Sequence, residues 1–156
     1  MIITELKDEP FDPGAVLAPL NRLGGGGAAS FVGLVRGDDG LVELLLEHHP
    51  DMTLPSMQRL VDEAVQRWSL LGAIVLHRHG PMEPGEAIVA VGTAAAHRHA
   101  ALESCAFLID RLKTEATFWK RERFADGRTR WVEPRPSDDE AARRWGAAIA
   151  PPGPTL

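Results

Sequence analysis

Two lysines seven residues apart, Lys113 and Lys120, form the pattern in this chain that most directly indicates chemistry. The aromatic side chains of Phe118 and Trp119 stand beside them in the sequence. A helix here would set both amines on one stripe about 10 Å apart, because seven residues make nearly two turns. Two ammonium groups facing one cleft suit an anionic ligand, and apolar neighbours that desolvate a lysine lower its pKa, so that it exchanges protons near neutral pH. The alternative interpretation is a solvated helical face.

Other cationic groups stand at the ends of predicted elements. Arg36 follows a predicted strand and precedes a glycine-containing turn, a common place for a side chain that contacts a ligand. His97 and Arg98 stand at the start of a predicted helix, where free backbone N–H groups and an arginine together favour an anion. With the two lysines, these groups predict an anion-binding site.

The charge of the chain is unevenly distributed. The net charge is -5, but residues 111–135 contain eight Lys or Arg against four Asp or Glu, which makes this segment +4 and the remainder -9. A basic patch on an acidic protein suits a small anion better than a polyanion, so we expect no nucleic-acid partner.

Hydrophobic periodicity predicts a single α+β domain with a mixed or antiparallel sheet and flanking helices. Strands are expected at 28–35, 41–48, 73–79, 87–94, 121–124 and 129–132. Helices are expected at 13–23, at 99–120 and at 137–145, and between a cap at Asp51 or Thr53 and Trp68. Residues 37–40 are expected to form the turn between the first two strands, and Asp126-Gly127 the turn of a hairpin. At 156 residues the chain fits one domain, expected at 1–149, and the proline-rich residues 150–156 are expected to be a disordered tail.

Paired histidines raise the question of a metal site. The segments 77–79 and 97–99 both read His-Arg-His, and two histidines on one face of a strand can bind zinc or copper. Asp, Glu and Cys are missing at helpful offsets, and the arginine between the histidines would repel a cation. We therefore expect no metal site at these histidines.

Cys105 is the single cysteine, so an internal disulfide is excluded and a reducing cytoplasm is the expected compartment. Apolar runs of membrane-spanning length and a secretion signal are both missing from the sequence, which also argues against a membrane location. Leu102, Cys105, Ile109 and Leu112 fall on one apolar helical stripe. This pattern favours a buried structural cysteine over the alternative, a nucleophile for acyl or sulfur transfer.

Five segments stand out as motifs along the chain: 31–37 (FVGLVRG), 46–52 (LEHHPDM), 96–98 (AHR), 112–122 (LKTEATFWKRE) and 130–133 (RWVE). In the same order, they resemble motifs of the large, catalytic subunit of molybdopterin synthase, where the second usually reads LEHYPGM and the fourth LKTRAPFWKRE. Several motifs in register are far more specific than any one alone. The chain departs from the family pattern where Leu34 replaces a common lysine and where Glu115 and Thr117 replace arginine and proline.

The resemblance implies an enzyme, a sulfurtransferase of molybdenum cofactor biosynthesis. That family transfers sulfur to cyclic pyranopterin monophosphate from the thiocarboxylated Gly-Gly carboxy terminus of a small ubiquitin-like subunit. It works as a homodimer within a heterotetramer, and the resemblance implies that neither a metal nor another cofactor is needed. The implied catalytic residues are Lys113 and Lys120, and the implied substrate-binding residues are Leu34, Val35, Arg36, His97, Arg98, Arg121 and Glu122. The alternative is a non-catalytic anion-binding or scaffold domain with the same fold.

Overall fold

The computed structural model describes residues 1–132 and 136–146. The expected tail at 150–156, and the domain boundary at 149, lie outside these residues. Helices and strands together form an α+β structure, as predicted. None of the helices in the described part of the chain is long and apolar enough to cross a membrane.

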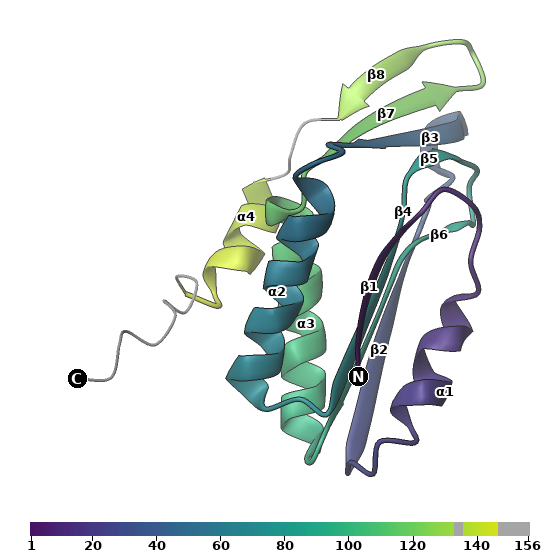
Figure 1. Cartoon of the computed structure of the whole chain (residues 1–156). Coiled ribbons are helices and arrows are strands. Elements are labelled where there is room, and N and C mark those ends of the chain that lie inside the picture. The colour runs from purple at the N-terminus through teal and green to yellow at the C-terminus, as the bar shows by residue number, and fades with distance from the viewer. Residues whose placement is uncertain (133–135, 147–156) are drawn as a thin grey trace.

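A four-stranded mixed sheet, sheet A, forms the centre of the molecule (Figure 1). Its strands, in spatial order, are β1 (Ile2–Lys7), β4 (Gly72–Arg78), β6 (Ala87–Ala95) and β2 (Gly27–Leu34). β1 is parallel to β4, and the other pairs are antiparallel. One face is covered by α2 (Thr53–Trp68) and α3 (Arg98–Glu115), and the other by the 3-10 turn η1 (Pro13–Val16) and α1 (Leu17–Leu20).

A second four-stranded sheet, sheet B, lies across one end of sheet A, at the top of Figure 1. Its strands, in spatial order, are β5 (Gly80–Met82), β3 (Leu41–His48), β7 (Phe118–Phe124) and β8 (Thr129–Val132), all antiparallel. A 3-10 turn, η2 (Asp38–Gly40), precedes β3, and α4 (Pro136–Arg143) packs beside α3. The expected strands at 28–35 and 41–48 are therefore present, but the turn between them connects two different sheets.

Three clusters of buried apolar side chains hold these layers together. The largest joins α2 and α3 to sheet A and includes the fully buried Phe107 and Met57. A second lies under α1, where Gly92 allows close approach because an added Cβ would stand 2.6 Å from a methyl carbon of Leu20. The third joins the two sheets through Val35, Leu46 and their neighbours. Burying each large apolar side chain contributes roughly 1.5–3 kcal/mol, so these clusters fix how the two sheets meet.

The expected helix at 99–120 is wrong in its last turns. α3 ends at Glu115, Ala116 takes an extended conformation (φ -75°, ψ 128°), and β7 begins at Phe118. β7 is a strand because β3, a distant segment of the chain, pairs with it: His48 lies opposite Phe118, and Leu46 opposite Lys120. Lys113 and Lys120 therefore do not share a helical stripe; one stands on a helix and the other on a strand.

A buried hydroxyl holds the connection between α3 and β7. Thr53, at the start of α2, is completely buried. Its Oγ1 accepts a hydrogen bond from the N–H of His49 at 2.9 Å and donates one to the carbonyl oxygen of Thr117 at 2.7 Å. The first turn of α2 thus fixes the segment from which β7 departs.

Replacing this hydroxyl is expected to destabilise the protein. Thr53→Val preserves the shape of the side chain but leaves the His49 N–H and the Thr117 carbonyl without their partner, so the free energy of unfolding should fall by about 1–3 kcal/mol. Urea denaturation measures the change. The control, Thr53→Ser, keeps the hydroxyl and loses one methyl group, which costs about 1 kcal/mol. Wild-type stability in Thr53→Val would contradict this role of the hydroxyl.

Candidate active site

Three of the predicted site cations lie at the end of the molecule where the two sheets meet. Lys113 is in the last turn of α3, Lys120 is on β7, and Arg36 follows β2. Next to Arg36, Val35 packs in the cluster that joins the sheets, and its N–H donates to the carbonyl oxygen of Glu86 at 2.9 Å. All three cations are exposed to solvent, so each is accessible to an anion from outside.

Strand alternation determines which side chains of β7 share a face with Lys120. Phe118 and Glu122 are two residues away on either side, so they point to the same side as Lys120. Glu122 lies opposite Arg130 of β8; its Oε2 accepts a hydrogen bond from Nε of Arg130 at 3.0 Å and forms an ion pair with Nη2 of the same guanidinium at 3.0 Å. We define the inner face of sheet B as the side of β7 and β8 that carries Lys120, Glu122 and Arg130.

Arg130 was not among the site residues predicted from the sequence. The sequence could have identified it, because the register of the hairpin centred on Asp126-Gly127 sets Arg130 opposite Glu122. Counting outward from the turn would have put an additional cation on the face of Lys120.

Arg121 does not share the face of Lys120, in contrast to the expectation that both line one pocket. It lies opposite Trp131 on β8, and its guanidinium carbon is 5.8 Å from the centre of the Trp131 ring. The reason is the two-residue period of a strand, which sends neighbouring side chains to opposite sides. A helix over the same residues would have allowed both to approach one cleft.

His97 and Arg98 lie at the other end of α3. The structure confirms that they stand at the N-terminus of a helix, since His97 is the N-cap residue and Arg98 the first helical residue. Fifteen residues of helix separate Arg98 from Lys113, a distance of about 22 Å along the axis. Both side chains are exposed. Within one copy of the chain they cannot contact the same small ligand as Lys113.

A buried histidine lies beneath the face of β7 that carries Lys120. His77 is 8% exposed, and its ring stacks on Phe118 with 4.0 Å between the ring centres. Its Nδ1–H donates to the carbonyl oxygen of Arg78 at 2.8 Å, which fixes the tautomer of the neutral ring. Burial lowers the pKa of His77 to about 4, against the opposing effect of that hydrogen bond and with help from the charge of Lys120. The imidazole therefore stays neutral at physiological pH beside the lysine.

The remaining candidate groups are placed away from these cations or are unreactive. Cys105 is buried, and burial raises the pKa of its thiol to about 11, so the thiol is protonated at neutral pH. Leu102, expected on the same apolar stripe, is instead 61% exposed. The part of the chain described by the structure contains no group of three His, Cys, Asp or Glu side chains arranged to hold a metal ion.

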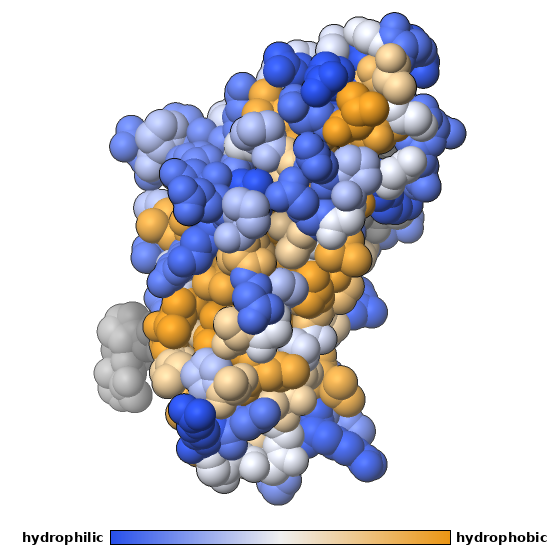
Figure 2. All heavy atoms as spheres, turned by 90° about the vertical axis from the view of Figure 1, so that its right-hand side faces the viewer, coloured by the Kyte–Doolittle hydropathy of each residue, from blue (hydrophilic) through white to orange (hydrophobic). Residues whose placement is uncertain are grey.

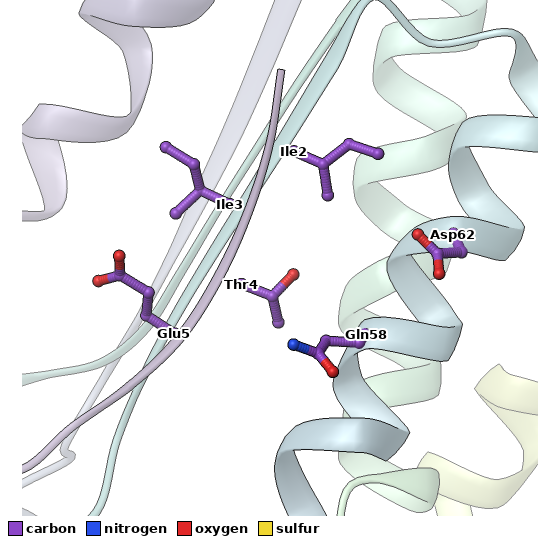
Figure 3. A pocket seen from close by; sticks show the side chains of 6 residues that line it. All are labelled: Ile2, Ile3, Thr4, Glu5, Gln58 and Asp62. Carbon is purple, nitrogen blue, oxygen red and sulfur yellow. The ribbon is translucent and has the colours of Figure 1, made fainter.

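A hollow of about 530 Å³ lies on another part of the surface, between the outer edge of β1 and α2 (Figure 3). Thr4 and Gln58 point toward one another across it, and Asp62 lies on the α2 side. The predicted site residues do not line it. Its carboxylates, from Glu5 and Asp62, disfavour an anion there.

The exposed cations at the junction of the two sheets suit a small anionic ligand, and they stand on an α+β fold. Residues 6–115 match the family described as MoaE protein. The chain belongs to this family.

The relatives agree along nearly the whole chain. A Pseudomonas aeruginosa protein named molybdopterin synthase catalytic subunit is 50% identical over 145 residues, which cover 90% of this chain and 96% of that protein. A solved structure of the molybdopterin biosynthesis MoaE protein from Burkholderia ambifaria has a TM-score of 0.78 and 41% identity, and covers 94% of this chain and 99% of that chain. The crystal structure of molybdopterin synthase from Staphylococcus aureus has a TM-score of 0.74 and 25% identity, and covers 83% of this chain and 96% of that chain.

The neutral state of His77 predicts a pH dependence of stability. Above about pH 6.5 neither the folded nor the unfolded chain protonates this residue, so its contribution is constant. Between pH 6.5 and about 4 the unfolded chain binds a proton that the folded chain does not, so the free energy of unfolding falls as the pH falls, by roughly 3 kcal/mol in total.

His77→Phe keeps an aromatic ring for Phe118 and removes this titration. Urea denaturation between pH 4 and 7 should therefore show a smaller decrease in stability toward acid for His77→Phe than for the wild type. The other titrating groups are common to both proteins and cancel in the comparison. Equal slopes for the two proteins would show that folding does not lower the pKa of His77.

Proposed function

We propose that this chain is the catalytic subunit of a molybdopterin synthase. It transfers sulfur from the thiocarboxylated carboxy terminus of a small ubiquitin-like subunit to cyclic pyranopterin monophosphate, which forms the molybdopterin dithiolene. Membership of the MoaE family and the name of the Pseudomonas aeruginosa relative support this function. The observation that carries it is the presence of Lys113, Lys120 and Arg36 at one end of the fold. A cytoplasmic location is part of the proposal, and a single buried cysteine suits it.

The cations reduce the electrostatic repulsion between the two reactants of this reaction. A thiocarboxylate and a cyclic phosphate are both anions, and their approach is opposed by repulsion unless positive groups are already in place. Lys113 and Lys120 supply charge and exchange protons while the thiocarboxylate attacks and the phosphate ring opens. Arg36 contacts the phosphate, with Leu34 and Val35 beside it. Neutral His77 adds no positive charge that would repel the Lys120 ammonium.

A second copy of the chain completes the site with His97 and Arg98. These residues are about one helix length from Lys113 in their own chain, so they serve the lysines only of a partner. If β2 paired with its own copy in antiparallel fashion, its Gly27 end, next to Arg98, would lie beside the Leu34 end of the partner. This arrangement brings Arg98 of one copy to the end of the other copy that carries Lys113.

The edges of sheet A favour this arrangement. β2 is an edge strand of eight residues without a charged side chain, and Phe31 and Leu34 on it are 42% and 56% exposed. Figure 2, which shows the face of the sheet that α1 covers, has apolar side chains gathered over its middle. The opposite edge strand, β1, contains Glu5 and Lys7, charges that discourage strand pairing. The uncharged edge is thus the better surface for a second copy.

The alternative is a scaffold domain that binds the same anions without turnover. A mixture of the purified chain, the thiocarboxylated small subunit and cyclic pyranopterin monophosphate distinguishes the two. The proposed function predicts the dithiolene product, and its absence would favour the scaffold.

Removing either lysine is expected to abolish most of the activity. Lys113→Ala and Lys120→Ala should each lower the rate of sulfur transfer by about 10²- to 10⁴-fold, because each removes a proton-transferring group. The chain contains three lysines, and the third, Lys7, forms an ion pair with Glu5 on β1. Lys7→Ala is therefore a matched control and should retain wild-type activity. Near-normal turnover in both of the other variants would overturn the assignment of the catalytic residues.

Complementation between copies tests the shared site. Homodimers of Lys113→Ala and of Arg98→Ala should both be impaired, whereas a heterodimer of the two, purified with two different tags, has one intact site of two. It should recover about half of the wild-type activity. A site formed within a single chain predicts no such recovery, because then neither site of the heterodimer would be intact.

A further inference from the structure

A tight turn between β5 and β6 contacts the chain on both sides of Arg36. The turn consists of residues 83–86, with the sequence Glu-Pro-Gly-Glu, and the N–H of Glu86 donates to the carbonyl oxygen of Glu83 at 3.1 Å. Gly85 has a φ of +90°, which favours glycine, and the proline before it suits the second position of such a turn. The sequence of the turn therefore fits its shape.

The backbone of Val35 pairs with this turn through two hydrogen bonds. Its N–H donates to the carbonyl oxygen of Glu86 at 2.9 Å, and its carbonyl oxygen accepts a hydrogen bond from the N–H of Gly85 at 2.9 Å. These bonds lie beyond Leu34, the last residue of β2 that pairs with β6. They fix the backbone immediately before Arg36.

Gly37, on the other side of Arg36, also lies against the turn. An added Cβ on Gly37 would stand 3.3 Å from the Cβ of Pro84. Nε of Arg36 is 3.9 Å from a carboxylate oxygen of Asp38, but both side chains are exposed, and an exposed ion pair at this distance contributes little. The contacts that Val35 and Gly37 make with the turn therefore determine where the Arg36 side chain begins.

An ion pair with a buried arginine holds the turn in place. One carboxylate oxygen of Glu86 accepts a hydrogen bond from the N–H of Glu83, and the other is 3.5 Å from Nη2 of Arg78. The side chain of Arg78 is 4% exposed and that of Glu86 is 30% exposed. A buried guanidinium is costly unless it is paired and hydrogen-bonded, so Glu86 is needed where it stands.

Arg78 also connects the turn to both sheets. Its guanidinium donates to the carbonyl oxygens of Asp8 at 2.9 Å, His79 at 3.1 Å and Pro81 at 3.2 Å. Asp8 follows β1 of sheet A, and Pro81 is on β5 of sheet B. The arginine therefore links the turn to the junction of the two sheets, where the two lysines of the proposed site also lie.

We propose that Arg78 and Glu86 are positioning residues for Arg36. Their ion pair fixes the turn, and the turn fixes the backbone from which Arg36 reaches the phosphate. This inference rests on the proposed function, because it concerns the residue that contacts the phosphate in that function. Arg78 and Glu86 do not touch the substrate and act through Arg36.

The variant Glu86→Gln tests the ion pair. It keeps the size of the side chain and an oxygen that accepts from the Glu83 N–H, but it removes the charge opposite Arg78. The KM for cyclic pyranopterin monophosphate should rise about 10- to 100-fold with a much smaller change in kcat, because a displaced Arg36 loses contact with the phosphate. The double variant Arg36→Ala/Glu86→Gln should have the same kcat/KM as Arg36→Ala, because no arginine is then left to position.

Glu63→Gln is the matched control. Oε1 of Glu63 is also 3.5 Å from the guanidinium of a buried arginine, Arg111, but this pair joins α2 to α3. Glu63→Gln should retain the wild-type KM. Hydrogen exchange measured by NMR gives a second comparison that does not depend on turnover: the amides of Val35 and Gly85 should exchange at least about 10-fold faster in Glu86→Gln than in Glu63→Gln.

The outcomes separate this inference from the proposed function. If the wild-type chain forms no dithiolene, the function is wrong and the positioning role is overturned with it. If the wild type is active but the losses from Arg36→Ala and Glu86→Gln add in the double variant, Glu86 acts independently of Arg36, and the positioning role alone is overturned. A wild-type KM in Glu86→Gln, or equal exchange of the Val35 and Gly85 amides in the two glutamine variants, would also overturn it.

Discussion

The change from helix to strand after Glu115 is the constraint on which the site depends. It ends α3 with Lys113 in its last turn and starts a strand that carries Lys120. Two interactions enforce it: the ladder between β3 and β7, and the hydrogen bond from the buried Thr53 hydroxyl to the Thr117 carbonyl. Without that break, the segment would continue as an exposed helix, and sheet B would lose its central strand.

The length of α3 sets a second constraint. The helix separates two groups of cations by about 22 Å, which is much longer than a pterin. One group is at the junction of the two sheets and the other at the helix N-terminus, where the backbone N–H groups add to the charge of Arg98. In the proposed two-fold dimer, the cations at the N-terminus of α3 in one copy lie near the sheet junction of the other copy. The uncharged edge of β2 is the proposed surface of contact. In the proposed function, the site therefore depends on assembly of two copies.

Much of this structure was predictable from local patterns. Amphipathic spacing predicted α2 with a cap at Asp51 or Thr53, His97 was expected at the N-terminus of α3, and Asp126-Gly127 indicated the hairpin of β7 and β8. Each of these features depends on residues close together in the chain. The motifs that indicated the family were also local, and the family match covers residues 6–115.

The errors have a common cause in contacts between distant segments. Residues 112–120 contain lysine, glutamate and alanine, which favour a helix, and pairing with β3, 70 to 83 residues earlier, extends the expected strand at 121–124 back to Phe118. The side of β7 on which Arg121 lies also depends on where that strand begins, since neighbouring residues of a strand point to opposite sides. The division of the strands into two sheets, and the burial of His77 beneath Phe118, also depend on tertiary contacts that periodicity does not contain.

A crystal structure of the dimer with cyclic pyranopterin monophosphate tests the central claim most directly. The account predicts that phosphate oxygens lie within about 3 Å of the amines of Lys113 and Lys120 from one copy and of the Arg98 guanidinium from the other. A phosphate bound away from the junction of the two sheets, or one held by a single copy with Arg98 distant, would contradict it.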